Sequence, residues 1–502
     1  RERLDLTIPR LRFNHPFQIR RIVEWQPDNL LLASDEGLTM YNIVTEKVSF
    51  VRADSKLPNG LNDNYLHELF IDRENALWIG TYFGGVNYVS SVQGNFQHYY
   101  KDNSQLDARI VSVFAHADKD NLWIGTDDAG FFYWDRQKQT FHPYRPQDGK
   151  RGPAYHNIHA LLQDGNKLFV GMFMGGLDIL DLRTGIFKNY KADTSLRSLY
   201  SSEIYALYKD SRQRIWIGTT AGLNLYHQQT DDFERIYELH GVSISHIFED
   251  EEKNLWVCSI NRGVYCLDYQ TGKWTHYFHQ LKDENSMLPT NQIITGCLDM
   301  QGVLWLGTDG DGLLRYDHNK DVFVRESLPE YIRVIYKILP DKDKLWLTTN
   351  NGMFCYQPLT SSLKFYNKKD GLQENLFLPN SGIQLSDGTI IVGGVNGFNE
   401  FRPDKIQANT QRPTVILTDF QLFNKPVVIG SKNSPLKVSI TYADCLELKH
   451  SHSIFSFSVA ALSYINTSKN RYRYRLEGFE KDWTETNHAP HVTYTNLPAG
   501  DY

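Results

Sequence analysis

The chain has 502 residues, of which 41% are hydrophobic and 22% charged, and its formal net charge is −6. This length is too great for one hydrophobic core and predicts several domains in a chain of ordinary globular composition. A charge so close to neutral gives no electrostatic reason to expect nucleic acid or an anionic membrane as a partner.

The N-terminal segment RERLDLTIPR (1–10) has neither an apolar h-region nor an initiator Met, so we expect a fragment of a longer protein. No run of 18 apolar residues occurs, and the chain is therefore predicted to contain no membrane span. Five cysteines without a CxxC pair do not make a disulfide scaffold. Cys258 and Cys266 flank one predicted hairpin turn, where either a cross-strand bridge or two small apolar side chains would fit.

One sequence pattern recurs along most of the chain. Its copies are NLLLASDEGLTMY (29–41), NALWIGTYFGGVNY (75–88), NLWIGTDDAGFFYW (121–134), KLFVGMFMGGLDIL (167–180), RIWIGTTAGLNLY (214–226), NLWVCSINRGVYCL (254–267), VLWLGTDGDGLLRY (303–316), KLWLTTNNGMFCY (344–356) and TIIVGGVNGFNEF (389–401). Measured at the Trp position, neighbouring copies lie 40–49 residues apart. A repeat of this period with several short strands is typical of the blades of a β-propeller.

Each copy predicts four antiparallel strands. An Asp six residues before the Trp, as at Asp72 and Asp299, is expected to accept backbone N–H groups in the turn before the Trp strand. A Gly within that strand, as at Gly125 and Gly218, would let adjacent blades approach closely. The fourth strand ends in aromatic residues, as in NFQHYY (95–100).

The repeat stops near Pro413, and a different pattern follows. Short alternating strands are predicted in PTVILTDFQLFNKPV (413–427), SIFSFSVAALSYIN (453–466), RYRYRLEGFEKDW (471–483) and HVTYTNLPAGDY (491–502). This succession predicts an antiparallel β-sandwich.

The LWIGT…GGL…Y pattern resembles the two-component regulator propeller repeat of Bacteroidetes hybrid two-component sensors. The run DGLQENLFLPNSGIQLSDGTIIVGGVNGFNEFRPD (370–404) is similar to the last blade of those sensors. The sequence pattern FSFSVAALSY…YRYRLEGFEKDW…YTNLPAGDY resembles their tyrosine-rich Ig-like domain, the Y_Y_Y domain. That domain would be incomplete at Tyr502.

The resemblance implies an all-β chain with a complete seven-bladed propeller. Counting the repeats back from the sandwich assigns residues 1–98 to the last two blades of a preceding propeller, 99–408 to the seven-bladed propeller and 409–502 to the Ig-like sandwich. A single nine-bladed ring is the alternative.

The resemblance also implies a function. It predicts the periplasmic sensor region of a hybrid two-component receptor in the inner membrane, which binds a glycan-derived oligosaccharide and signals through the Ig-like domain to a histidine kinase that regulates polysaccharide utilisation. The Ig-like domains are expected to pair in a homodimer, and membrane contact would come only from other parts of the receptor. The alternatives are a protein-binding structural or secretion-associated propeller and, less favoured, a propeller glycan hydrolase or lyase.

The sequence contains no recognised catalytic motif, so we expect no catalytic residue, cofactor or metal in this segment. A ligand would meet the loops between the second and third strands and between blades. Aromatic faces beside amides, Arg and carboxylates suit carbohydrate. The candidate ligand-binding residues are Tyr82, Phe83, Asp127, Asp128, Tyr155, His156, Met172, Phe173, Tyr200, Asn261, Arg262, Asp309 and Asn350.

Overall fold

The chain divides into two compact units. The computed structural model describes residues 18–54, 60–90, 95–118, 120–146, 152–280, 287–407, 412–431, 434–465 and 467–502. One unit is formed by residues 94–406, and the other by residues 1–93 together with 407–502.

Strands dominate the secondary structure, and the all-β class predicted from the sequence is confirmed. The helical segments are single 3₁₀ turns: η1 (Tyr237–Leu239), η2 (Pro358–Thr360), η3 (Lys368–Asp370), η4 (Pro403–Lys405), η5 (Ile440–Tyr442) and η6 (Thr467–Lys469). Within the described ranges, no helix is long and apolar enough to cross a membrane.

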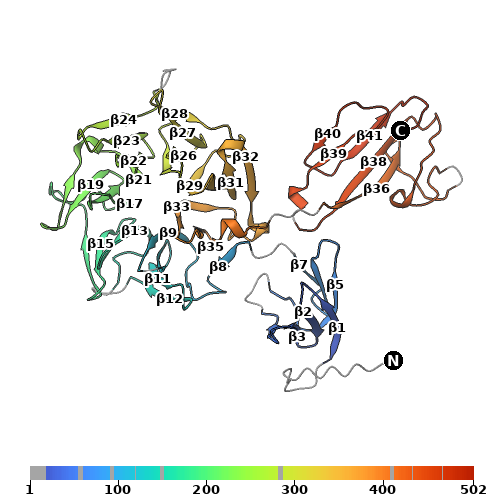
Figure 1. The fold of residues 1–502 in the computed structure, drawn as a ribbon, viewed down its shortest axis with the longest axis horizontal. Helices are drawn as coiled ribbons and strands as arrows, with labels where there is room; N and C mark the ends of the chain where they lie inside the picture. The colour runs from blue at the N-terminus through green and yellow to red at the C-terminus, as the bar shows by residue number, and fades with distance from the viewer. Residues whose placement is uncertain are drawn as a thin grey trace. The chain divides into compact units, whose positions relative to one another are not determined.

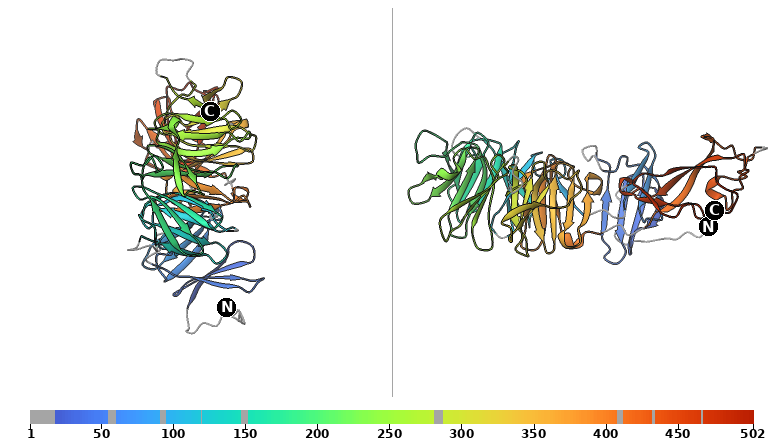
Figure 2. Two further views of the ribbon diagram at one scale, coloured as in Figure 1. Left: turned by 90° about the vertical axis from the view of Figure 1, so that its left-hand side faces the viewer. Right: turned by 90° about the horizontal axis from the view of Figure 1, so that it is seen from above.

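The unit of residues 94–406 is a ring of four-stranded antiparallel sheets arranged as propeller blades (Figure 1). From the inner to the outer strand, the first four sheets are β9 (Val111–His116), β10 (Leu122–Thr126), β11 (Phe131–Asp135) and β12 (Thr140–Tyr144); β13 (Ile158–Asp164), β14 (Lys167–Met172), β15 (Gly176–Asp181) and β16 (Ile186–Tyr190); β17 (Ile204–Lys209), β18 (Ile215–Thr219), β19 (Gly222–His227) and β20 (Asp232–Arg235); and β21 (Ile244–Glu249), β22 (Leu255–Ser259), β23 (Val264–Leu267) and β24 (Trp274–Tyr277). The remaining sheets are β25 (Ile293–Leu298), β26 (Leu304–Thr308), β27 (Leu313–Asp317) and β28 (Val322–Arg325); β29 (Ile335–Asp341), β30 (Lys344–Thr349), β31 (Met353–Gln357) and β32 (Ser362–Tyr366); and β33 (Phe377–Gln384), β34 (Ile390–Gly394) and β35 (Gly397–Phe401) with β8 (Gln97–Tyr99). In the side views of Figure 2 these strands run between the two faces of the ring.

The ring closes at its inner and outer edges. Each inner strand contacts the inner strand of the next sheet, and β33 contacts β9. At the outer edge of the last sheet, β8 pairs with β35, and Tyr99 lies opposite Phe398. The assignment of residues 95–100 to the fourth strand of the second repeat was therefore wrong. Closure by a strand from the far end of the unit leaves the last sheet with no free outer edge at β35.

A glycine in the second strand of most sheets allows close approach of the next sheet. A Cβ added at Gly218 would lie 2.5 Å from Ile244 Cγ2, and one added at Gly125 would lie 3.0 Å from Ile158 Cγ2. The same contact recurs between Gly171 and Ile204, Gly307 and Ile335, and Gly393 and Val111. In each case the β-branched residue is buried and lies near the start of the next inner strand. The predicted role of these glycines is confirmed.

The hydrophobic core of the ring lies between neighbouring sheets. One cluster joins Trp123 and Phe131 of the first sheet to Ile158, Leu168 and Leu180 of the second. Comparable clusters lie at the other junctions. The apolar faces of the sheets are buried against neighbouring sheets. The inner edge of each sheet therefore lines the centre of the ring.

The cysteines of the chain are all free. Cys258 lies opposite Val264 and Cys266 lies opposite Trp256, so the two cysteines are not cross-strand partners. Both are buried. The structure supports the interpretation that Cys258 and Cys266 are small apolar side chains of neighbouring strands.

The second unit contains two further sheets with the same meander. The first is β1 (Ile19–Glu24), β2 (Asn29–Ser34), β3 (Gly37–Asn42) and β4 (Val48–Val51), and the second is β5 (Leu66–Ile71), β6 (Leu77–Thr81) and β7 (Val86–Val89). They enclose a small core that includes Leu31, Leu66 and Leu77. Large apolar side chains remain exposed on both sheets: Ile19, Ile22, Phe50, Tyr65, Phe70 and Val86.

The C-terminal part of this unit consists of antiparallel strands. One sheet has the order β37 (Lys425–Pro426), β36 (Thr414–Leu422), β38 (Ile454–Leu462) and β41 (His491–Thr495), and β39 (Tyr472–Tyr474) pairs with β40 (Thr484–Thr486). Its core includes Phe420, Phe455 and Tyr494. These elements agree with the predicted sandwich.

Candidate functional site

The inner strands of the ring share an irregularity that the sequence did not reveal. In β9, β13, β17, β21, β25 and β29 the register with the second strand shifts one residue after the first pair. A bulge of this kind re-aims a side chain and is common next to functional sites. The residues at the shifts are Ser112, His159, Tyr205, Ser245, Ile294 and Tyr336.

Some polar side chains at the centre of the ring satisfy the backbone of a neighbouring inner strand. Ser112 Oγ donates to the carbonyl of Ile158, and Ser245 Oγ donates to the carbonyl of Ile293 at 2.7 Å. Asn380 Nδ2 donates to the carbonyl of Ser245 at 2.8 Å, which links β33 to β21 across the ring. These bonds fix the inner edges, so side chains at the bulges are held on a rigid frame.

Four side chains gather where the first three sheets of the ring meet. His159 Nε2 lies 3.6 Å from Asp127 Oδ1, and the His159 ring is 4.7 Å from the ring of Tyr205. The ring of Phe173 lies 6.2 Å from His159 and 6.5 Å from Tyr205. Asp127 and Phe173 come from loops between second and third strands, whereas His159 and Tyr205 are bulge residues. We call these four residues the mouth cluster.

The mouth cluster has unusual electrostatics. Burial, with a smaller contribution from the Asp128 carboxylate, raises the pKa of Asp127 to about 6, and burial lowers the pKa of His159 to about 4. At neutral pH the pair is therefore a carboxylate beside a neutral imidazole. Asp127 Oδ1 is buried without a hydrogen-bond partner among the described residues.

An unpaired carboxylate oxygen beside three rings suits a neutral, hydroxylated ligand. A buried acceptor without a donor is costly, and a ligand hydroxyl would supply the missing bond. The partly exposed faces of Phe173 and Tyr205 offer apolar stacking surfaces. The arrangement can bind a polyol through one strong acceptor and two aromatic faces.

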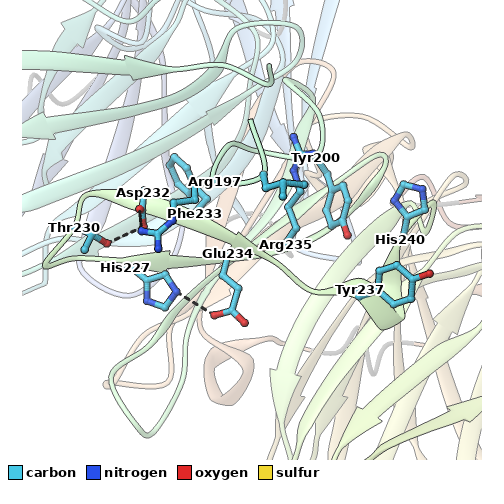
Figure 3. A pocket seen from close by; sticks show the side chains of 11 residues that line it. Arg197, Tyr200, His227, Thr230, Asp232, Phe233, Glu234, Arg235, Tyr237 and His240 are labelled. Atoms are coloured by element: carbon cyan, nitrogen blue, oxygen red, sulfur yellow. Dashed lines mark hydrogen bonds and ion pairs between the residues drawn. The ribbon is translucent and has the colours of Figure 1, made fainter. Parts of the chain in front are cut away.

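A second candidate site lies at the outer side of the third sheet. It is a cavity of 680 Å³ lined by Leu196, Arg197, Tyr200, His227, Thr230, Asp232, Phe233, Glu234, Arg235, Tyr237 and His240 (Figure 3). Leu196 is 83% and Tyr237 84% exposed, so both present apolar surface to solvent.

The charged residues of this cavity are engaged by the protein itself. Arg235 donates to the carbonyls of Asp193 and Leu199 at 3.0 and 2.8 Å, and its guanidinium lies 5.2 Å from the Tyr200 ring. Arg197 pairs with Asp232 at 2.6 Å, as Figure 3 shows. Because these charges are already paired, the cavity offers fewer unsatisfied polar groups to a ligand than the mouth cluster does.

The structure brings together only some of the candidate residues named from the sequence. Asp127 and Phe173 lie in the mouth cluster, and the charge of His156 acts on the carboxyl of Asp127. The ring of His156 lies 4.4 Å from that of Tyr155. Asp128 accepts the backbone N–H of Arg109 at 3.0 Å, which stabilises a loop.

The other candidates are dispersed. Met172 is buried in the core between sheets, and Tyr200 lines the outer cavity. Asn261 Oδ1 accepts the backbone N–H of Ser243 at 3.1 Å. Arg262, Asp309 and Asn350 are exposed loop residues on sheets beyond the mouth cluster. Tyr82 and Phe83, whose rings are 4.6 Å apart, lie in the other unit.

The mouth cluster contains two residues that were not named as ligand-binding candidates, His159 and Tyr205. Each directly follows the buried isoleucine that packs against the glycine of the preceding sheet. Their position in the sequence, one residue after this isoleucine, is the feature from which His159 and Tyr205 could have been predicted as site residues. In the described part of the chain, no group of three or more His, Cys, Asp or Glu could hold a metal ion.

Two segments of the chain match known family models. Residues 201–221 match the family "Two component regulator propeller", and residues 463–502 match the Y_Y_Y domain family. The chain thus carries a regulator propeller repeat and a Y_Y_Y domain in the order that the sequence resemblance predicted.

A curated relative matches most of the chain. The chain is 26% identical over 436 residues to histidine kinase P4 of Formosa agariphila, and the match covers 84% of the chain but 31% of the kinase. The chain therefore spans about a third of that relative's length.

Solved structures share the fold. The extracellular domain of BT3049 from B. thetaiotaomicron, assigned as a hybrid two component system, is 22% identical and superposes with a TM-score of 0.74 over 96% of this chain and 69% of its own. The extracellular domain of BT4673 from the same organism, 22% identical, superposes with a TM-score of 0.54 over 97% of this chain and 66% of its own.

Proposed function

We propose that the chain is the periplasmic sensor region of a hybrid two-component receptor and that it binds a glycan-derived oligosaccharide. The observation that carries this proposal is the order of two family matches on one chain, a regulator propeller repeat followed by a Y_Y_Y domain. The fold shared with an extracellular domain assigned to a hybrid two component system supports it. The histidine kinase and the membrane anchor would lie in other parts of the receptor.

The proposed domain organisation is one seven-bladed propeller, preceded by two blades of another and followed by the sandwich. The ring of residues 94–406, closed by β8, supports the first part. The exposed apolar residues of the two N-terminal sheets, such as Phe70 at 61%, support the second, because further blades would cover them.

The mouth cluster is the proposed contact for the sugar. Asp127 would accept a sugar hydroxyl, and the rings of Phe173 and Tyr205 would stack on the C–H faces of a pyranose. His159, neutral at physiological pH, has a ring nitrogen for a second hydroxyl. The segment would bind without catalysing a reaction, and the signal would pass to the sandwich through a change in the orientation of rigid parts.

The proposed homodimer forms through the sandwich. Several apolar side chains of that part of the chain are exposed, among them Val428 at 71%, Tyr442 at 79% and Trp483 at 50%. Sedimentation equilibrium of the chain with and without its ligand measures this association. A monomer under both conditions would contradict the proposed dimer but leave the proposed ligand class intact.

The ligand class is tested by titration calorimetry of the chain against a panel of oligosaccharides from plant, host and microbial glycans. We expect one glycan class to bind and Tyr205→Ala to weaken that binding about 10-fold or more, since stacking on an aromatic ring contributes about 1 kcal/mol or more. Arg183→Ala, an exposed change in the turn between β15 and β16, at the opposite end of that sheet from the loop of Phe173, is the control and should leave the affinity unchanged.

Two results would overturn the proposal. Tight binding of a protein with no binding of any glycan would favour the protein-binding propeller. Release of shorter products from a polysaccharide by the purified chain would favour a glycan hydrolase or lyase.

A further inference from the structure

A lysine and a histidine meet at the centre of the ring with no carboxylate beside them. Lys337 on β29 has its Nζ 3.2 Å from His246 Nε2 on β21. Among the described residues no carboxylate lies within ion-pair distance of Lys337. Lys337, His246 and the neighbouring Cys297 each keep part of their surface exposed.

The hydrogen bonds of His246 favour one charge state of Lys337. The backbone N–H of Gly296 on β25 donates to His246 Nδ1 at 3.3 Å. A neutral imidazole accepts at one nitrogen and donates at the other, so Nε2 must carry the proton. Because Nε2 is then a donor, Lys337 Nζ has to accept, and only the neutral amine has a lone pair with which to do so.

Burial of Lys337 and the protonated thiols near it also favour the neutral amine. Burial lowers the pKa of Lys337 to about 8 and holds the pKa of His246 well below its usual value. The other ionisable groups that act on the lysine are the thiols of Cys258 on β22 and Cys297 on β25, and burial raises the pKa of both, so they stay protonated. On the β33 side, the lysine side chain packs near Gly382, which carries no charge.

We propose that Lys337 is a nucleophilic amine that binds small aldehydes at the centre of the ring as an imine. The hydrogen bond from His246 Nε2–H to Nζ first breaks, the freed lone pair of Nζ attacks the carbonyl carbon, and the C=O π pair moves to oxygen. Both amine protons leave with that oxygen as water, so amine and aldehyde give imine and water. His246 keeps its own proton and is a positioning residue, whose Nε2–H holds first the neutral amine and then the imine nitrogen. This site is separate from the mouth cluster and goes beyond the proposed sensing of oligosaccharides.

A trapping experiment tests the proposal on the intact chain. The chain is incubated with glycolaldehyde and cyanoborohydride, which reduces an imine to a stable secondary amine, and the modified lysines are located by peptide mass spectrometry between pH 6 and 10.5. Lys138 is the surface comparator, because its ion pair with Asp135 raises its pKa. At pH 7.5 the neutral fraction of an amine with a pKa near 8 exceeds that of an ordinary lysine on the order of 100-fold. We therefore expect labelling of Lys337 to reach half its plateau near pH 8, whereas labelling of Lys138 still rises at pH 10.

Substitutions of His246 and Cys297 distinguish imine formation at Lys337 from an effect on folding. His246→Gln keeps one acceptor for Gly296 and one donor for Lys337, so it should retain the labelling profile near pH 8. His246→Asp lacks the donor and places a carboxylate beside Nζ, so its profile should move to higher pH while labelling of Lys138 stays the same. Cys297→Ser excludes thiol adducts as the source of the label and should leave the profile unchanged. The proposal fails if Lys337 stays unmodified where Lys138 is modified, or if both lysines share one pH profile.

Discussion

Asp299 Oδ2 accepts a hydrogen bond from the indole Nε1 of Trp305 at 2.7 Å. Its other oxygen, Oδ1, accepts the backbone N–H groups of Gln301 and Val303, each at 2.9 Å. One carboxylate therefore stabilises the turn and satisfies the buried tryptophan of the strand that follows. The same Trp–Asp bond recurs at Asp72, Asp210 and Asp250, which suggests that it is a structural unit of the repeat.

Replacement of Asp299 by Ala should lower the free energy of unfolding of the ring by about 2–4 kcal/mol. The change leaves the indole N–H of a tryptophan that is 1% exposed, and two turn N–H groups, without acceptors. Chemical denaturation measures the loss. Asp317→Ala is the control, because that carboxylate accepts one N–H in an exposed turn and should cost below about 1 kcal/mol. Equal losses in the two variants would contradict the role given to Asp299.

Gly218→Ala should destabilise the ring by about 1–3 kcal/mol, because the new methyl group would meet Ile244 at a distance far below van der Waals contact. Gly80 has the same place in its repeat, but an added Cβ there would have nothing nearer than 3.6 Å. Gly80→Ala should therefore change the stability of its own unit by about 0.5 kcal/mol or less. Calorimetry of both variants tests the comparison, and a similar loss at the two glycines would show that the next sheet is not the cause.

Much of the ring could be predicted from the sequence because its determinants are local. Asp299 binds Trp305 within one repeat, and Gly218 contacts Ile244 of the next. The closure by β8 could not be predicted in the same way. Residues 97–99 follow the second repeat directly in the chain, yet they pair with Phe398–Glu400 some 300 residues later. Strand order along a chain does not show which two edges meet when a ring closes.

The candidate site was harder to predict than the fold. Loop residues such as Asp127 and Phe173 could be named because turns between strands carry function in propellers. His159 and Tyr205 lie inside strands, where alternation of side chains would assign them to a packed or a solvent face. The bulge at each of these residues interrupts the alternation, and the sequence marks it only through the isoleucine that precedes each of them.

The raised pKa of Asp127 makes the stability of the ring depend on pH. Its folded-state pKa of about 6 lies above the usual value of 3.8, so the folded chain binds this proton more tightly than the unfolded chain. The stabilisation is complete below pH 3.8 and is lost as the pH rises through 6. Asp127→Asn should thus raise the free energy of unfolding at pH 7.5 by about 1–3 kcal/mol and change it little at pH 4. Denaturation at both pH values measures the difference, and an effect independent of pH would contradict the assignment.

Tyr99 connects the closing strand to the last sheet. Its ring stacks on Phe398 with centroids 4.8 Å apart and an interplanar angle of 14°, and its hydroxyl donates to Glu400 at 3.1 Å. The strand β8 has three residues, and beside this stack His98 Nε2 lies 2.7 Å from the carbonyl oxygen of Asn396. Tyr99→Ala should cost about 2–4 kcal/mol and release β8 from β35.

Hydrogen–deuterium exchange can distinguish local opening of the ring from general loss of stability. If β8 is the closing strand, Tyr99→Ala should accelerate exchange first in the amides of β35, whose outer edge would become free, while β10 and β18 keep their protection. Tyr99→Phe keeps the stacked ring and loses only the hydroxyl, so it should cost about 1 kcal/mol and leave the exchange of β35 nearly unchanged. Uniform acceleration across all sheets in Tyr99→Ala would mean that the ring unfolds as one unit and that β8 does not act as a separate closure.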